Sequence, residues 1–161
     1  MVENPEHYIE AFAEAGASLI TIHPEATRDA AGCLKHIRAH GMQAGLAINP
    51  DKPLCLIEEY IQSIDLLLIM SVYPGFAGQS FIETSIEKVS HARQLINNAH
   101  AKVMLGIDGG IKSSNIAKVV AAGADFCVIG SGLFHCANYR KQMQEIRAQI
   151  HLASSDAAAD R

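Results

Sequence analysis

The sequence predicts an α/β fold built from parallel βα units, and two observations support this prediction. Five short apolar segments have the length and composition of strands, and each is followed by a stretch whose apolar residues have helical spacing. In addition, residues 15–22 match residues 122–129 in pattern, which indicates a repeated turn from helix to strand. We therefore expect a parallel sheet covered by helices.

The expected elements alternate along the chain. Asn4 and Pro5 are typical of a helix start, Gly16 is typical of a helix end, and Ser113 with Ser114 can cap a later helix. The predicted helices cover residues 5–15, 30–40, 53–64, 82–97, 113–122 and 139–150. The predicted strands cover residues 19–23, 43–48, 66–72, 103–108 and 126–131.

The spacing of these strands favours a barrel. Three of the four intervals between successive strand starts are 23 or 24 residues, and the fourth is 37. A (β/α)₈ TIM barrel of that period needs roughly 200 residues. If Met1-Val2 is the tail of a strand, the 161 residues hold six strand positions. We therefore predict an α/β fold with an incomplete TIM barrel that lacks the first two βα units and most of the third strand. The predicted barrel covers residues 1–152, and residues 153–161 form a flexible tail. A doubly wound open sheet is the alternative, but no glycine-rich turn follows the first strand.

Composition argues against several classes of binding partner and indicates a cellular compartment. The chain is 49% hydrophobic and 19% charged, with a net charge of -4 and no basic cluster, so neither nucleic acid nor an anionic membrane is an expected partner. No apolar run is long enough to span a bilayer. The four cysteines show no C-x-x-C spacing, which is typical of reduced thiols and indicates the cytoplasm.

The longest βα unit carries an unusual loop. After the apolar run 66–70, Pro74, Gly75, Ala77 and Gly78 mark a loop that also contains three aromatic residues, Tyr73, Phe76 and Phe81. A plain surface connection rarely carries so many aromatics. We expect this loop to close over a ligand.

Two neighbouring strand ends have the residues of a phosphate site. Asp108 ends one strand and is followed by Gly109 and Gly110, and the next strand ends in Gly130-Ser131. Glycines let a phosphate approach backbone N–H groups, and barrels commonly bind phosphate after their last two strands. A carboxylate at a strand end is typical of catalysis or metal binding, although Asp-Gly-Gly is also a common turn.

Other candidate residues allow more than one interpretation. Met70 lies in an apolar run and has the burial statistics of a core residue. His23 also ends a strand and could be a ligand, an orienting group or a hydrogen-bonded histidine. His36 and His40 lie four residues apart on one predicted helix without the glutamate of a zinc protease motif, so they indicate a solvated face.

Five motifs, taken in order, resemble those of the ribulose-phosphate 3-epimerase family: Met1 to Pro5, His23 to Ala26, Ala44 to Pro50, Met70 to Gln79 and Ile107 to Ile111. The resemblance implies a cytoplasmic enzyme of the pentose phosphate pathway that forms a homo-oligomer. It implies interconversion of ribulose 5-phosphate and xylulose 5-phosphate through an enediolate stabilised by a divalent metal, which could be Zn, Fe, Mn or Co. In the family, two aspartates exchange the C3 proton from opposite faces of the sugar and ligate the metal together with two histidines.

The resemblance also implies roles for individual residues. Asp108 matches one of the two aspartates, as both a catalytic residue and a metal ligand. Met70 and Met1 match methionines that line the enediolate site. The substrate flap corresponds to Pro74, Gly75, Phe76, Ala77 and Gly78, and the phosphate-binding backbone to Gly109, Gly110, Gly130 and Ser131.

The chain departs from the family pattern in two respects. It begins at the methionine of the family's His-Leu-Met-Val motif, so both metal-binding histidines and the other aspartate have no counterpart in these 161 residues. We therefore expect the chain by itself to be inactive. Tyr73 and Gly132-Leu133 also differ from the commonest pattern, which leaves allulose 6-phosphate open as the substrate. The non-enzymatic alternative is a remnant that binds phosphate or a partner chain, with two unpaired sheet edges.

Overall fold

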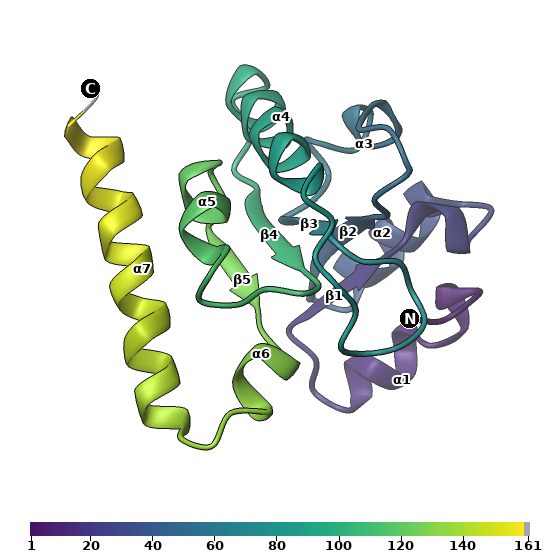
Figure 1. The fold of residues 1–161 in the computed structure, drawn as a ribbon. Helices are drawn as coiled ribbons and strands as arrows, with labels where there is room; N and C mark the ends of the chain where they lie inside the picture. The colour runs from purple at the N-terminus through teal and green to yellow at the C-terminus, as the bar shows by residue number, and fades with distance from the viewer. Residues whose placement is uncertain (160–161) are drawn as a thin grey trace.

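The computed structural model describes residues 1–159 and contains one parallel sheet of five strands in the order β1-β2-β3-β4-β5 (Figure 1). The strands are β1 (Leu19–Ile22), β2 (Gln43–Ile48), β3 (Leu66–Met70), β4 (Met104–Asp108) and β5 (Phe126–Val128). The helices are α1 (Ile9–Glu14), α2 (Ala30–Ala39), α3 (Cys55–Glu58), α4 (Ser85–Asn98), α5 (Ile116–Ala121), α6 (Ser131–Phe134) and α7 (Tyr139–Ala159), with 3₁₀ turns η1 (Pro5–His7) and η2 (Pro24–Ala26).

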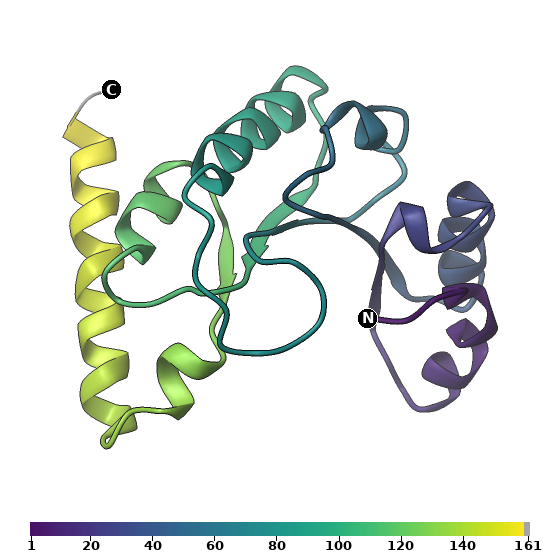
Figure 2. The same ribbon diagram turned by 45° about the vertical axis from the view of Figure 1, so that its right-hand side comes forward.

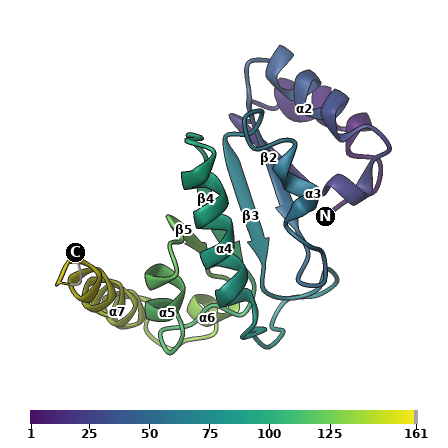
Figure 3. The same ribbon diagram turned by 90° about the horizontal axis from the view of Figure 1, so that it is seen from above.

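The core lies between one face of the sheet and the helices. Side chains alternate along each strand, so one set points at the helices. This set is fully buried in the three central strands and consists of Leu46, Ile48, Leu67, Ile69, Leu105 and Ile107. Figure 3 shows the sheet from above, with α2 and α3 on one side of the molecule and α4, α5 and α7 towards the other. The predicted parallel α/β architecture is confirmed.

The turn from helix to strand is repeated, as the sequence predicts. Gly16 and Gly123 both have positive φ, +88° and +109°. Each donates its N–H to the carbonyl three residues earlier, Ala13 and Val120 respectively, at 2.9 Å. Positive φ favours glycine, so the same residue type ends both helices.

A second repeated feature is an aspartate that fixes the start of a strand, at β3 and again at β5. Asp65 precedes β3, and Asp125 precedes β5. Each carboxylate accepts a hydrogen bond from a backbone N–H of the neighbouring strand, at 2.8 Å for Asp65 and 2.7 Å for Asp125. Each also pairs with an arginine from an outer helix, Arg38 at 2.9 Å and Arg93 at 2.6 Å. The two βα units are therefore joined to their neighbours by the same contacts, which the sequence analysis did not foresee.

Several local predictions are wrong. Met1-Val2 is not part of a strand, so the described residues contain five strands and not six. Asn4 precedes η1 in a left-handed conformation and makes no side-chain cap. Asn115, and not Ser113 or Ser114, precedes α5. The helix expected over residues 53–64 is reduced to α3, and β5 ends at Val128, before the unpredicted α6.

The two edge strands of the sheet each pair on one side among the residues that the structure describes. β1 pairs with β2, and β5 pairs with β4. Figure 2 shows α7 beyond β5 at one side of the molecule and α1 with α2 at the other. Residues 154–159 continue α7, so the predicted flexibility of residues 153–161 stays a prediction, and residues 160–161 lie outside the described part. None of the helices up to residue 159 has the length and apolar composition that a membrane span requires.

Candidate functional site

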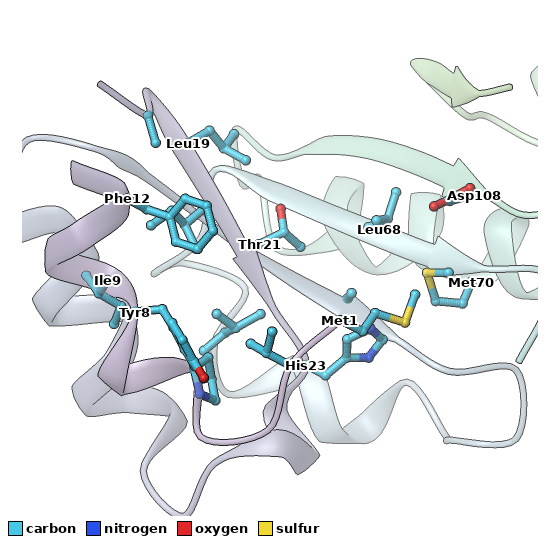
Figure 4. A pocket seen from close by; sticks show the side chains of 16 residues that line it. Met1, Tyr8, Ile9, Phe12, Leu19, Thr21, His23, Leu68, Met70 and Asp108 are labelled. Carbon is cyan, nitrogen blue, oxygen red and sulfur yellow. The ribbon is translucent and has the colours of Figure 1, made fainter. Parts of the chain in front are cut away.

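Two adjoining cavities meet at the carboxyl ends of β3 and β4. The larger has a volume of about 500 Å³ and extends from α1 past β1 to β4, and the smaller, of about 300 Å³, lies under the loop after β3. Met1, Met70 and Asp108 line both. Figure 4 shows Asp108 and Met70 at one end of the larger cavity and Tyr8 and Phe12 at the other. All the predicted site residues except Pro74 therefore line this pair of cavities.

Asp108 is held in place by Ser71, the residue that follows β3. Its backbone carbonyl accepts hydrogen bonds from the N–H of Ser71 at 2.8 Å and from the Ser71 hydroxyl at 2.9 Å. The same hydroxyl lies 2.6 Å from the carbonyl of Gly109. Ser71 is fully buried, and sequence reasoning missed it because a serine in an apolar strand carries no signal of its partner. The carboxylate of Asp108 thus projects into the cavities from a fixed backbone.

Burial raises the pKa of the Asp108 carboxyl, because protein atoms displace the water that would solvate its charge. The folded state then binds this proton more tightly than the unfolded state does. Asp108→Asn is expected to raise the free energy of unfolding near neutral pH, where the wild-type carboxylate is charged and desolvated. The gain should disappear below the usual pKa of aspartate, where the carboxyl is protonated in both states.

This prediction is checked by urea denaturation of both proteins at about pH 7 and about pH 3. The matched control is Asp51→Asn, which removes an exposed carboxylate that lies 3.6 Å from the Lys52 ammonium. An Asp108→Asn protein that is less stable than the wild type at neutral pH would contradict the desolvation argument.

The turn after Asp108 exposes backbone N–H groups. Gly109 and Gly110 have φ of +121° and +64°, values that residues with a side chain rarely adopt. Asn115 fixes the turn: its side-chain oxygen accepts from the N–H of Lys112 at 2.8 Å, and its amide donates to the carbonyl of Gly110 at 3.1 Å. Sequence reasoning also missed this residue, because it expected a serine cap.

A second glycine-rich turn faces the first across the smaller cavity. Gly130 and Ser131 line it together with Gly109 and Gly110. Among the described residues, the N–H groups of Gly110, Gly130 and Ser131 make no turn or loop hydrogen bond. Backbone donors of this kind can bind an anion, so the predicted grouping of these residues around one space is present in the structure.

The loop after β3 covers the smaller cavity. Its residues 72–73 and 75–79 line that cavity, and Figure 2 shows the loop as a wide turn in the middle of the molecule. The Gln79 amide donates to the carbonyls of Tyr73 at 2.7 Å and Phe76 at 3.0 Å, which closes the loop on itself. Phe76 is 75% exposed. The loop has the position of a flap and a large apolar side chain free to cover a ligand.

The histidines are placed differently from one another. His23 lines the larger cavity, and its ring lies beside the Met1 side chain (Figure 4). His36 on α2 and His40 directly after its end are both exposed, with ring centroids 4.8 Å apart, as predicted for a solvated face. Within the described part of the chain, no three or more His, Cys, Asp and Glu side chains come together as metal ligands would. Asp108 is one carboxylate, and by itself it does not fit the ligand set of a bound transition metal.

Comparison with known proteins adds the evolutionary relationship. A family model described as "Ribulose-phosphate 3 epimerase family" matches residues 1–134. Proteins named ribulose-phosphate 3-epimerase from Buchnera aphidicola, Escherichia coli and Aquifex aeolicus are 41%, 39% and 42% identical to the chain. The matches cover 96%, 97% and 96% of this chain and 68%, 69% and 70% of the respective relatives.

Solved structures share the fold at lower sequence identity. The 3-hexulose-6-phosphate synthase from Salmonella typhimurium superposes with a TM-score of 0.68 at 17% identity, over 95% of this chain and 71% of that one. The orotidine 5'-phosphate decarboxylase from Pyrococcus horikoshii has a TM-score of 0.66 at 15% identity, over 94% of this chain and 71% of that one. At these identities the likeness concerns the fold alone.

Proposed function

Because this chain belongs to the ribulose-phosphate 3-epimerase family, we propose that its two adjoining cavities bind a phosphorylated ketose, with D-ribulose 5-phosphate as the preferred ligand. The reaction it serves is epimerisation at C3, which gives D-xylulose 5-phosphate. One structural observation supports the proposal in addition to the family relationship: Asp108 and the two glycine-rich turns line the same smaller cavity.

The proposed roles follow from the chemistry of each group. A carboxyl whose pKa is raised can carry a proton closer to neutral pH, so Asp108 would remove or return the C3 proton from one face of the sugar. The phosphate would accept hydrogen bonds from N–H groups of Gly109, Gly110, Gly130 and Ser131. The buried thioether of Met70 would pack against the sugar without competing for the proton. The loop from Pro74 to Gly78 would exclude water.

The family resemblance implies a divalent metal, but the residues that the structure describes do not assemble a site for one. Two-sided proton transfer at one carbon also needs a second acid, and Asp108 reaches one face. We therefore propose that the 161 residues alone bind the ketose phosphate without turning it over. Metal ligands and a second acid would have to come from further residues, which would also complete a barrel around the concave face of the sheet.

We further propose that the chain works in the cytoplasm, where its four free cysteines stay reduced, and that it self-associates through the free edges of β1 and β5. Size-exclusion chromatography checks the second point. A monomer at all concentrations would contradict self-association.

Calorimetric titration tests the proposed ligand. D-ribulose 5-phosphate is expected to bind, D-ribulose without its phosphate is expected to bind much more weakly, and inorganic phosphate is expected to compete. D-allulose 6-phosphate provides the arm for the alternative hexulose substrate. Equal binding of D-ribulose with and without the phosphate group would contradict the assignment of the two glycine-rich turns.

A further inference from the structure

His23 lies beside a group of polar contacts that the roles above do not use. Its side chain is 12% exposed and follows the last residue of β1. It lines the larger cavity together with Met70 and Asp108 (Figure 4). Its Nδ1 atom is buried and has no hydrogen-bond partner among the described residues. A histidine that only fills a core normally has its buried nitrogen paired.

Glu25 and Asn49 lie behind the imidazole. The Glu25 carboxylate oxygen Oε1 is 3.8 Å from His23 Nδ1 and accepts a hydrogen bond of 2.5 Å from the Asn49 amide. The pKa of His23 is lowered by burial, against the attraction of the Glu25 carboxylate and with a smaller contribution from the N-terminal amine. A neutral imidazole offers one donor and one acceptor, which matches a sugar hydroxyl.

Lys88 fixes the loop that carries Asn49. From α4 its ammonium donates to three backbone carbonyls: Asn49 at 2.7 Å, Pro50 at 2.8 Å and Lys52 at 2.6 Å. An ammonium has three donors, so all of them are used within one loop. This loop follows β2 and lies beside η2, which carries Glu25. The hydrogen bonds therefore run from α4 through Asn49 to Glu25, whose carboxylate lies 3.8 Å from the ring of His23.

We propose that His23 is a substrate-facing residue that hydrogen-bonds a hydroxyl or carbonyl oxygen of the phosphorylated ketose, and that Glu25, Asn49 and Lys88 are positioning residues for it. This inference rests on the proposed function, because it assigns the sugar end of the same ligand. It places the phosphate under the loop after β3 and extends the ketose towards the end of β1.

NMR of the 161-residue protein with labelled histidine and backbone amides tests the proposal, with the His23 signal assigned from His23→Gln. D-ribulose 5-phosphate is expected to shift the His23 ring signal and the amides of Gly110 and Ser131. Inorganic phosphate is expected to shift the two amides alone. His23→Ala should weaken ketose binding about tenfold, the usual effect of one hydrogen bond, and leave phosphate binding unchanged.

Two further variants separate positioning from packing. His23→Gln, whose amide can reach the position of Nε2, should restore most of the affinity that His23→Ala loses. Lys88→Met should move the His23 ring signal and weaken ketose binding severalfold. Its matched control is Lys52→Met in the same loop, whose ammonium lies 3.6 Å from the Asp51 carboxylate; this variant should do neither.

The experiments distinguish a failure of the inference about His23 from a failure of the proposed function. If the ketose shifts Gly110 and Ser131 but not the His23 ring, the inference about His23 is wrong and the proposed function stands. If His23→Gln binds the ketose as weakly as His23→Ala, His23 is a packing residue and the inference is again wrong. If the ketose shifts none of these signals, the proposed function fails and this inference fails with it.

Discussion

Replacement of Gly110 by alanine is expected to lower the free energy of unfolding by about 2–4 kcal/mol and to abolish binding of D-ribulose 5-phosphate. Two costs add at this position. The backbone has a φ of +64°, which strains an alanine. A Cβ atom would also lie 2.6 Å from the backbone nitrogen of Phe81 and 2.8 Å from its Cα, and a backbone cannot move aside as a flexible side chain can. The turn that offers its N–H groups to the phosphate would then shift.

Two alanine variants serve as matched controls in urea denaturation. Gly16→Ala introduces the same kind of strain, at φ +88°, into open space, and is expected to cost about 1 kcal/mol. Gly130→Ala has neither a positive φ nor a neighbour within 4 Å, and is expected to be nearly neutral in stability. If Gly110→Ala costs no more than Gly16→Ala, the close contact between Gly110 and the backbone of Phe81 is not a constraint on the site.

Incubation of the 161-residue protein with D-ribulose 5-phosphate and Zn²⁺, Fe²⁺, Mn²⁺ or Co²⁺ is expected to give no D-xylulose 5-phosphate above the uncatalysed background. Epimerisation requires removal of a proton from one face of C3 and its return on the other. The structure provides one carboxylate at this place and no cluster of metal ligands among the residues it describes. General acid–base catalysis contributes about 10²–10⁴-fold, so loss of one partner should be easily measured.

The ribulose-phosphate 3-epimerase from Escherichia coli, assayed in parallel, shows that the metals and the substrate are competent. Asp108→Asn in the 161-residue protein is the second control, because it keeps the shape of the side chain and removes the base. Formation of D-xylulose 5-phosphate by the wild type but not by Asp108→Asn would contradict the expected inactivity. It would mean that a second acid already lies within this chain.

The sequence predicted most of the architecture because the signals are local. Apolar runs and helices that end in glycine recur with the period of a βα unit. A glycine such as Gly16 marks a helix end because the backbone there needs a positive φ. Asp108 with its two glycines was recognisable for the same reason: a strand end followed by flexible residues can be read from adjacent positions. Their meeting with Gly130 and Ser131 followed from the order of parallel strands.

The residues that the sequence analysis missed act through contacts distant in sequence. The Ser71 hydroxyl contacts backbone carbonyls 37 and 38 residues later in the sequence. The Lys88 ammonium donates hydrogen bonds to backbone carbonyls of a loop 36 to 39 residues earlier. Neither residue type specifies such a partner. The short α3 and α6 were misjudged because one helical turn gives too few positions to show a period. The count of six strand positions took Met1-Val2 as the tail of a strand, but these two residues pair with no strand in the part of the chain that the structure describes.

A crystal structure of the protein with D-ribulose 5-phosphate would show whether the phosphate and the sugar lie at the proposed places. We expect the phosphate within hydrogen-bonding distance of the N–H groups of Gly110, Gly130 or Ser131, with C3 of the sugar beside the carboxylate of Asp108. A phosphate bound away from these two turns, or a bound sugar from which the Asp108 carboxylate points away, would contradict the proposed function.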